Sequence, residues 1–279
     1  MKNRIISALI YTPLMIAGVI FQGWYMFALL SVFMVIATHE MYRALAASGL
    51  KPVRWAGFLS CALAIASLIF FDTEMALLAC IAGAVIAMSA VVLKGKIAVN
   101  DMIASMLPTI YPGVFFVLLL SLLKLENRAV CTVALVLTIF STSINDVFAL
   151  FSGMLFGKHK LSPEISPKKT IEGSIGGLIF CTAFTVAVPA LLKLIVFFVP
   201  TFAAELEVLP SLWCFVPLGI VISILAQIGD LTASMFKRHC GIKDFGNIMP
   251  GHGGIMDRLD GALFCGAACA IFFRLIGLG

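Results

Sequence analysis

The sequence has few charged residues and no polar linkers, and this scarcity limits the class of protein. Only 12% of the 279 residues are charged, whereas 62% are hydrophobic, and the mean hydropathy is +1.11. These values exclude an ordinary water-soluble domain. No repeat, low-complexity tract or long linker interrupts the apolar segments. The composition therefore predicts an all-α polytopic integral membrane protein.

The eight cysteines lack the spacing of a disulfide or zinc framework. The sequence contains no C-x-x-C pair, and most cysteines fall within or beside apolar segments. Disulfides and a zinc site are therefore not expected. Cys265 and Cys269 share a helix face, where packing is the simpler interpretation.

Nine apolar segments are expected to cross the membrane as helices. They are Ile5–Phe21, Trp24–Thr38, Trp55–Phe71, Met75–Leu93, Ile103–Leu123, Ala129–Leu150, Ser174–Val199, Trp213–Ile228 and Leu259–Leu278. The first is expected to be retained, since no small-x-small cleavage site follows it. His39–Val53 and Lys94–Pro108 are more polar, which is typical of interfacial segments and of plain loops alike.

The basic residues predict the orientation of these spans. With the N-terminus in the cytoplasm, all but four of the nineteen Lys and Arg residues fall on the cytoplasmic side, as the positive-inside rule requires. The C-terminus would then lie outside. We expect residues 1–125, with spans one to five, to form a scaffold. Residues 126–279, with spans six to nine, would form the catalytic transmembrane domain.

One charged stretch, Gly229–Gly261, stands out against this apolar background. It holds four of the fourteen Asp and Glu residues and four of the nineteen Lys and Arg residues. Its acids are Asp230, Asp244, Asp257 and Asp260, and its bases are Lys237, Arg238, Lys243 and Arg258. Such a concentration of charge beside a membrane indicates a functional site.

The spacing within this stretch predicts its local structure. If the entering helix continues through it, Asp230, Ser234 and Lys237 share one face, because they are four and three residues apart. Pro250 and the glycines after it would form a loop whose backbone N–H groups could approach an anion. The loop residues are Gly251, His252, Gly253 and Gly254.

A second helix beginning near Ile255 would place Asp257 in its first turn. Asp230 and Asp257 would then approach from two helix ends, which suits Mg²⁺, a cation that takes few carboxylates and shares its other positions with water and phosphate. Basic side chains nearby, such as Arg258, would neutralise the rest of a polyphosphate.

A second polar block lies in the middle of the chain. Asp146 interrupts an apolar run, where a carboxylate is costly unless it has a partner or a function. A structural ion pair with a neighbouring helix is the alternative. The lysines that follow, including Lys168 and Lys169, would attract anionic lipid headgroups in the simplest case. Pro163 and Pro167 stiffen the loop, which favours a shaped pocket.

These motifs resemble a known family. The pattern S-x-x-K-R-x-x-x-x-K-D-x-x-x-x-x-P-G-H-G-G-x-x-D-R-x-D, from Ser234 to Asp260, resembles the signature of the phosphatidate cytidylyltransferases, and about a dozen fixed positions make it highly specific. The runs Phe156–Leu161 and Ser166–Gly173 are similar to a second block of that family. Two residues depart from it: Ala233 replaces a usual Glu, and Leu150 replaces an expected Tyr.

The resemblance implies that phosphatidate attacks CTP to give CDP-diacylglycerol and pyrophosphate, a step of phospholipid biosynthesis. It implies Mg²⁺, with a second cation such as K⁺ allowed, and a homodimer in the cytoplasmic (inner) membrane whose active site faces the cytoplasm. No nucleic-acid partner is expected. The catalytic residues would be Asp230, Asp257, Lys237, Arg238 and Arg258, the two Asp residues holding the metal. The substrate-binding residues would be Asp146, Ser166, Lys168, Lys169, Glu172, Ser234, Lys243, Asp244, Gly251, His252, Gly253, Gly254 and Asp260.

Three alternatives remain open at this stage, the third being a catalytically weakened member of the family, which Ala233 in place of the usual Glu suggests. Transporters also use intramembrane carboxylates such as Asp146 and glycine-broken helices such as the one near Asp230, so a transporter with a cytoplasmic anion site is the first. A related CTP-dependent lipid enzyme, either dolichol-kinase-like or a CTP transferase of archaeal ether lipids, is the second.

Overall fold

The computed structural model describes residues 2–95, 97–198, 206–249, 251 and 253–278, and their internal contacts divide the chain into two compact units. The first unit comprises Met1–Ser121 and Met235–Leu259. The second comprises Leu122–Ser234 and Asp260–Gly279. The predicted division into a scaffold and a catalytic domain at residue 125 concerns function and stays a prediction.

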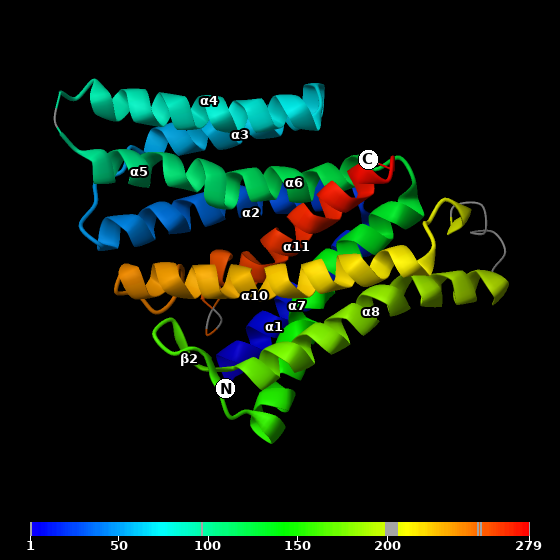
Figure 1. Cartoon of the computed structure of the whole chain (residues 1–279). Coiled ribbons are helices and arrows are strands. Elements are labelled where there is room, and N and C mark those ends of the chain that lie inside the picture. Colours follow the sequence, from blue (N-terminus) through cyan, green and yellow to red (C-terminus); the bar gives the residue numbers. More distant parts are fainter. Residues whose placement is uncertain (1, 96, 199–205, 250, 252, 279) are drawn as a thin grey trace. The chain divides into compact units, whose positions relative to one another are not determined.

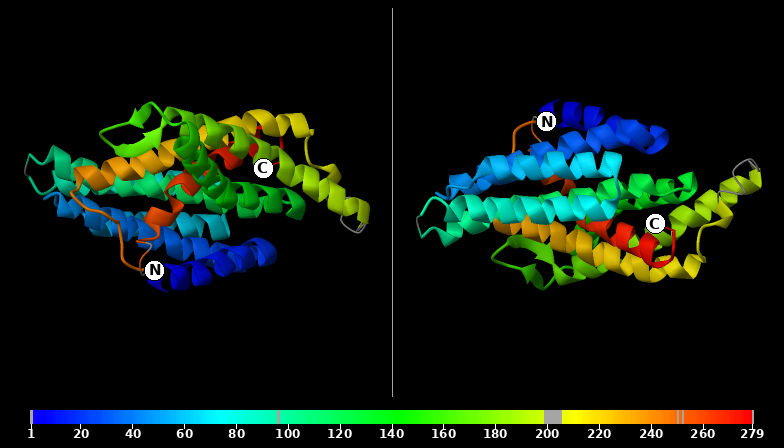
Figure 2. Two further views of the ribbon diagram at one scale, coloured as in Figure 1. Left: turned by 90° about the horizontal axis from the view of Figure 1, so that it is seen from below. Right: turned by 90° about the horizontal axis from the view of Figure 1, so that it is seen from above.

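The first unit is built from apolar helices (Figure 1). They are α1 (Lys2–Phe21), α2 (Gly23–Ala47), α3 (Arg54–Phe70), α4 (Thr73–Val92), α5 (Val99–Pro108), the π-helical turn η1 (Thr109–Val114) and α6 (Phe115–Ser121). Helices α3 and α4 lie side by side in Figures 1 and 2. Gly83 of α4 lies against Ser60 of α3, with no space for a larger side chain. Small residues at such contacts let apolar helices approach closely.

A set of hydrogen bonds fixes the end of α2 against α5. Tyr42 donates its hydroxyl to the carbonyl oxygen of Ser105 at 2.8 Å. The Ser105 hydroxyl in turn accepts the Val53 N–H at 2.8 Å, and Asp101 accepts the Lys51 N–H at 2.8 Å. These bonds satisfy backbone groups that the turn after α2 would otherwise leave unpaired. They hold the C-terminal part of α2 in a defined position.

The helix predicted over Ile103–Leu123 is interrupted. Tyr111 has φ −125° and ψ 106°, which are not helical angles, between Pro108 and Pro112. Proline removes a helical hydrogen bond and crowds the preceding turn, so the break between α5 and α6 follows from the sequence. Tyr111 stacks on Phe236 with ring centroids 6.0 Å apart.

The second unit contains two long helices, which pack against each other and are connected by a short β-hairpin. Its elements are η2 (Leu122–Lys124), α7 (Arg128–Phe156), β1 (Lys160–Ser162), β2 (Ser166–Thr170), α8 (Ile171–Phe198) and η4 (Leu212–Cys214). Helices α7 and α8 meet at the hairpin end (Figure 1). A methyl group on Gly173 would lie 2.6 Å from the Ala149 carbonyl oxygen, and one on Gly177 would lie 2.7 Å from Asn145 Oδ1. The glycines of G-x-x-x-G therefore allow this close packing.

Helices α10 (Phe215–His239) and α11 (Met256–Leu275) each contribute residues to both units. The boundary falls after Ser234 in α10 and after Leu259 in α11. Within the second unit the two helices cross closely, since a methyl group on Gly229 would lie 2.6 Å from the Asp260 carbonyl oxygen. The predictions that one helix continues through Arg238 and that the next begins near Ile255 are confirmed.

In the part of the chain that the structure describes, each of the nine predicted spans overlaps helical structure, and Ile103–Leu123 is divided among α5, η1, α6 and η2. Six of these helical segments are long and apolar enough to cross a membrane by length and composition. The protein is thus an all-α membrane protein with one added β-hairpin. The span count, the cytoplasmic N-terminus and the outer C-terminus stay predictions. Two polar segments are more helical than expected: α2 continues to Ala47, and α5 begins at Val99.

Candidate active site

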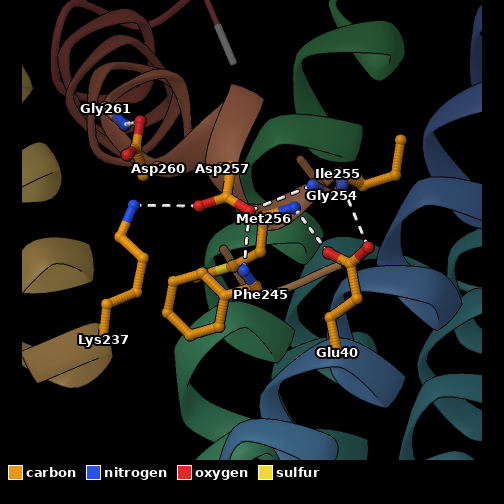
Figure 3. Close-up of polar contacts among 9 residues, drawn as sticks. All are labelled: Glu40, Lys237, Phe245, Gly254, Ile255, Met256, Asp257, Asp260 and Gly261. Carbon is orange, nitrogen blue, oxygen red and sulfur yellow. Dashed lines mark hydrogen bonds and ion pairs between the residues drawn. The ribbon is translucent and has the colours of Figure 1, made fainter. Parts of the chain in front are cut away.

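Asp257 lies in the first turn of α11, and its carboxylate is the centre of a polar cluster in the first unit (Figure 3). Oδ1 accepts a hydrogen bond from Lys237 Nζ at 2.9 Å. Oδ2 accepts the Phe245 N–H at 2.7 Å and the Gly254 N–H at 3.0 Å. The Asp257 side chain is 3% exposed, so these charge-assisted bonds lie away from water, where they are strongest.

Glu40 of α2 holds the same loop from another direction (Figure 3). Its two carboxylate oxygens accept the backbone N–H groups of Ile255 at 3.2 Å and Met256 at 2.9 Å. Glu40 is 2% exposed. Because the first N–H groups of a helix have no partner within it, a carboxylate at the start of α11 satisfies them and interacts favourably with the helix dipole.

The glycines beside this cluster are required by the close approach of its carboxylates. Gly253 has φ +84°, and a methyl group there would lie 2.7 Å from Asp257 Oδ2. Gly246 and Gly254 lie directly against the Glu40 carboxylate. The prediction assigned Gly253 and Gly254 to an anionic ligand. In the structure, the backbone N–H groups of Gly254, Ile255 and Met256 donate instead to the carboxylates of Asp257 and Glu40. Gly251 also has a positive φ, and His252 lies outside the described residues.

The second unit contains a cavity of about 310 Å³ between α7, the hairpin, α8 and α10. Polar residues on its wall include Asp146, Lys168, Lys169 and Asp230, and Lys169 forms an ion pair with Asp230. The remainder is lined by Asn145, Ala149, Leu150, Gly153, Met154, Leu161, Thr170, Gly173, Ser174 and Gln227. Leu150 and Met154 are 61% and 64% exposed, so one side of the cavity opens toward apolar surface.

A buried polar network lies behind the cavity. Asn145 Oδ1 accepts hydrogen bonds from Ser223 Oγ at 2.8 Å and Gln227 Nε2 at 3.2 Å. Ser174 donates its hydroxyl to Gln227 Oε1. Asn145 is 1% exposed, and its Nδ2 has no hydrogen-bond partner among the described residues. A buried amide donor on a cavity wall can bond a ligand there.

Glu172 closes the base of the hairpin. Its carboxylate accepts the Lys158 N–H at 3.1 Å and lies 2.7 Å from His159 Nδ1. Thr170 accepts the Gly173 N–H at 3.1 Å and so caps α8. These contacts fix the strand that carries Lys168 and Lys169. Glu172, predicted to bind substrate, here orders the segment next to the cavity.

The structure brings some predicted residues together and leaves others apart. Asp146, Lys168, Lys169 and Asp230 share the cavity, whereas Lys237, Gly253, Gly254 and Asp257 share the polar cluster. The others in the described part of the chain lie outside these contacts: Ser166 and Ser234 are half-buried, Arg238, Lys243, Asp244 and Arg258 are exposed, and Asp260 accepts the Gly261 N–H at 2.7 Å. Of the two departures from the family pattern, Ala233 is buried and Leu150 lines the cavity.

Sequence reasoning missed Glu40 and Gln227 as site residues. Glu40 follows the predicted end of the second span, Thr38, by two residues and falls in His39–Val53, which was expected to be either an interfacial segment or a plain loop. The rule that singled out Asp146, a carboxylate within an apolar helix, would also have found it. Gln227 gave no signal, because an amide in an apolar helix carries no charge and no motif.

The side chains present supply only part of the ligands that a Mg²⁺ ion needs. Among the residues that the structure describes, no three His, Cys, Asp or Glu side chains form a metal-binding group. Asp230 and Asp257 are each paired with a lysine. One or two carboxylates nevertheless suffice for Mg²⁺ when substrate phosphates and water supply the other ligands. Each Asp residue, taken by itself, is therefore compatible with a cation that arrives on a polyphosphate.

The described residues thus form a helical membrane protein with two lysine-paired carboxylates and a lysine-bearing cavity. Residues 2–276 match the Cytidylyltransferase family, and the chain belongs to that family.

Curated relatives carry the name phosphatidate cytidylyltransferase. The one from Staphylococcus haemolyticus (strain JCSC1435) is 47% identical over 121 residues, which cover 43% of this chain and 41% of the relative. The one from Thermotoga maritima (strain ATCC 43589 / DSM 3109 / JCM 10099 / NBRC 100826 / MSB8) is 37% identical over 140 residues, which cover 50% and 48%. The matched part of the chain thus spans less than half the length of either relative.

Proposed function

We propose that this protein is a phosphatidate cytidylyltransferase, which converts CTP and phosphatidate to CDP-diacylglycerol and pyrophosphate. The observation that carries the proposal is the cavity of the second unit, which combines Lys168 and Lys169 with the exposed apolar residues Leu150 and Met154. A phospholipid needs both, because its phosphate requires cations and its acyl chains require apolar surface. Membership of the cytidylyltransferase family and the names of the relatives support the reaction.

In the proposed reaction, a phosphate oxygen of phosphatidate attacks the α-phosphorus of CTP. A new P–O bond forms, the bond from the α-phosphorus to the bridging oxygen breaks, and pyrophosphate leaves with that oxygen. A phosphate monoester is largely dianionic at neutral pH, since its second pKa is about 6, so no general base is needed. The barrier comes from bringing two polyanions together, which positioning and positive charge can lower.

The lysines of the cavity would bind the lipid phosphate. Lys169 is already held by Asp230, and Lys168 is exposed beside it on β2. Asn145 would add a donor from the cavity wall, since its amide is buried beside the lipid site. Ser166 and Asp146 would complete the polar side. The acyl chains would then leave the cavity past Leu150 and Met154.

The polar cluster around Asp257 would bind the nucleotide. Lys237 is 19% exposed at its side chain, so it can reach a phosphate group while it remains near Asp257. Arg238 and Arg258 are exposed and would neutralise further phosphate charge. We expect Lys243, Asp244 and the glycine loop with His252 to contribute to CTP binding.

A divalent cation is part of the proposal. Mg²⁺ bound to CTP would be held by Asp230 and Asp257, and a second cation such as K⁺ is compatible with it. When bound, the cation would neutralise charge on the polyphosphate.

The proposed setting is the cytoplasmic membrane, with the site facing the cytoplasm, where CTP occurs. The scaffold and catalytic regions divided at residue 125, the nine spans and a homodimer belong to the same proposal. The distribution of Lys and Arg supports this orientation.

The test is pyrophosphate release by the detergent-purified protein with CTP, phosphatidate and Mg²⁺. We expect release that depends on the lipid and that is lost in Asp257→Asn. Asp72→Asn is the control, because Asp72 caps α4 at Met75 and Asn is an equally good cap. Absence of release from the unmodified protein, with intact folding, would disprove the proposed function.

A further inference from the structure

We propose that Glu40 is a positioning residue of the active site, which holds the N-terminus of α11 and thereby sets the position of Asp257. The inference rests on the proposed function, since it assigns a role in that reaction. Glu40 would contact neither CTP nor phosphatidate. It would act through the backbone of the loop that carries Gly254 and Asp257.

The first argument is the division of the backbone N–H groups between two carboxylates. Asp257 accepts the N–H of Gly254, and Glu40 accepts those of the next two residues, Ile255 and Met256. Three consecutive N–H groups at the start of α11 are therefore satisfied by side chains (Figure 3). Asp257 directly follows Met256, so a shift of the backbone at Met256 moves the Asp257 carboxylate away from Lys237.

The second argument is the fit of the surrounding glycines. Gly246 and Gly254 lie directly against the Glu40 carboxylate, and a methyl group at either position would force that carboxylate to shift. Two separate loop segments are thus shaped around one buried side chain. A carboxylate that merely occupied space would not require both segments to approach it so closely.

The third argument is the chemistry of the contact. Each carboxylate oxygen accepts one N–H, so both oxygens are used. Glutamine is similar in size, but its NH₂ group would face one of the two N–H donors and leave it unsatisfied. At 2% exposure, water cannot replace the lost bond. Glu40→Gln therefore changes the loop while it preserves the volume of the side chain.

The matched control lies two residues earlier on the same helix. Thr38 is fully buried and bonds Cys61 at 3.3 Å, and within the described part of the chain its hydroxyl makes no hydrogen bond to the glycine loop. Thr38→Val removes one buried hydrogen bond of α2 at nearly constant volume. It therefore reports what a local loss of stability in α2 does to activity.

The kinetic experiment measures kcat and the KM for each substrate in Glu40→Gln, Glu40→Asp and Thr38→Val. We expect Glu40→Gln to lower kcat/KM for CTP at least about tenfold, because a small displacement of a catalytic group has effects of this size. The KM for CTP should rise, and that for phosphatidate should not. Glu40→Asp keeps the charge and both acceptors and should recover part of the loss. Loss of folded protein alone lowers the maximal rate and leaves both KM values unchanged.

Hydrogen exchange provides a readout that does not depend on turnover. Glu40→Gln should increase exchange in peptides covering residues 253–258 and leave those of α3 and α4 unchanged. If the unmodified protein does not turn over CTP but the loop still opens in Glu40→Gln, the proposed function fails and the anchoring contact stands. If Glu40→Gln matches Thr38→Val in both KM values and in exchange, the positioning role is wrong. If Glu40→Gln cannot be expressed as folded protein, the KM values and hydrogen exchange of Glu40→Asp decide the question instead.

Discussion

Lys237 Nζ lies 2.9 Å from Asp257 Oδ1, and this pair joins the end of α10 to the start of α11. The Asp257 side chain is 3% exposed and that of Lys237 is 19% exposed. Two backbone N–H groups complete the environment of the carboxylate. The pair therefore has a structural role and, in the proposed reaction, a catalytic role. Mutations can separate these two roles.

Lys237→Met should remove activity and stability together. The substitution leaves a buried carboxylate without its cation, which costs about 3–5 kcal/mol. Adding Asp257→Asn to it removes the unpaired charge, so the double variant should regain thermal stability in detergent but no pyrophosphate release. A double variant as unstable as Lys237→Met would show that the charge of Asp257 is not the cause.

The Lys169–Asp230 pair should behave as a unit in lipid binding. Lys169→Ala and Asp230→Asn should each lower kcat/KM for phosphatidate, and the double variant should be little worse than the poorer single one, because either change breaks the same pair. Lys160→Ala, on the neighbouring strand β1, should have a small effect. Fully additive losses would argue against a shared role.

Gly253→Ala should inactivate the protein, and Gly241→Ala should not. Both glycines have positive φ, +84° and +65°, so alanine strains the backbone by about 1 kcal/mol at either position. Only at Gly253 would the new methyl group contact the Asp257 carboxylate; Gly241 faces open space. The measurements are the rate of pyrophosphate release and the midpoint of thermal unfolding for each of the two variants. Equal activity in both would remove the steric argument.

Asn145→Leu should destabilise the second unit. It leaves Ser223 and Gln227 without their shared acceptor, at a cost of about 1–3 kcal/mol. Ser223→Ala removes one donor and should cost about 1 kcal/mol. Thermal denaturation in detergent provides the comparison. A larger effect of Ser223→Ala would show that the network is organised around another residue.

Local features of the fold could be read from the sequence because each depends on neighbouring residues. Apolar length places the helices, the spacing of Asp230, Ser234 and Lys237 places these three residues along α10, and the Pro–Gly run directly precedes the start of α11. The signature from Ser234 to Asp260 indicates the family, which the match over residues 2–276 establishes. Prediction failed locally at the end of α2, where helix propensity gave too weak a signal, and at Tyr111, where Pro108 and Pro112 indicate the break but the apolar run was interpreted as one span.

The partners of the charged residues required the tertiary structure. The sequence alone determined the membrane class, the helices, the family signature and the charged residues of the two motif blocks. It could not show that Lys237 pairs with Asp257, that Lys169 pairs with Asp230, or that Glu40 reaches Ile255 over 215 residues of chain. Such contacts have no period in the sequence, because packing of distant helices sets them. Only the folded chain decides which carboxylate meets a lysine and which meets the backbone of a helix start.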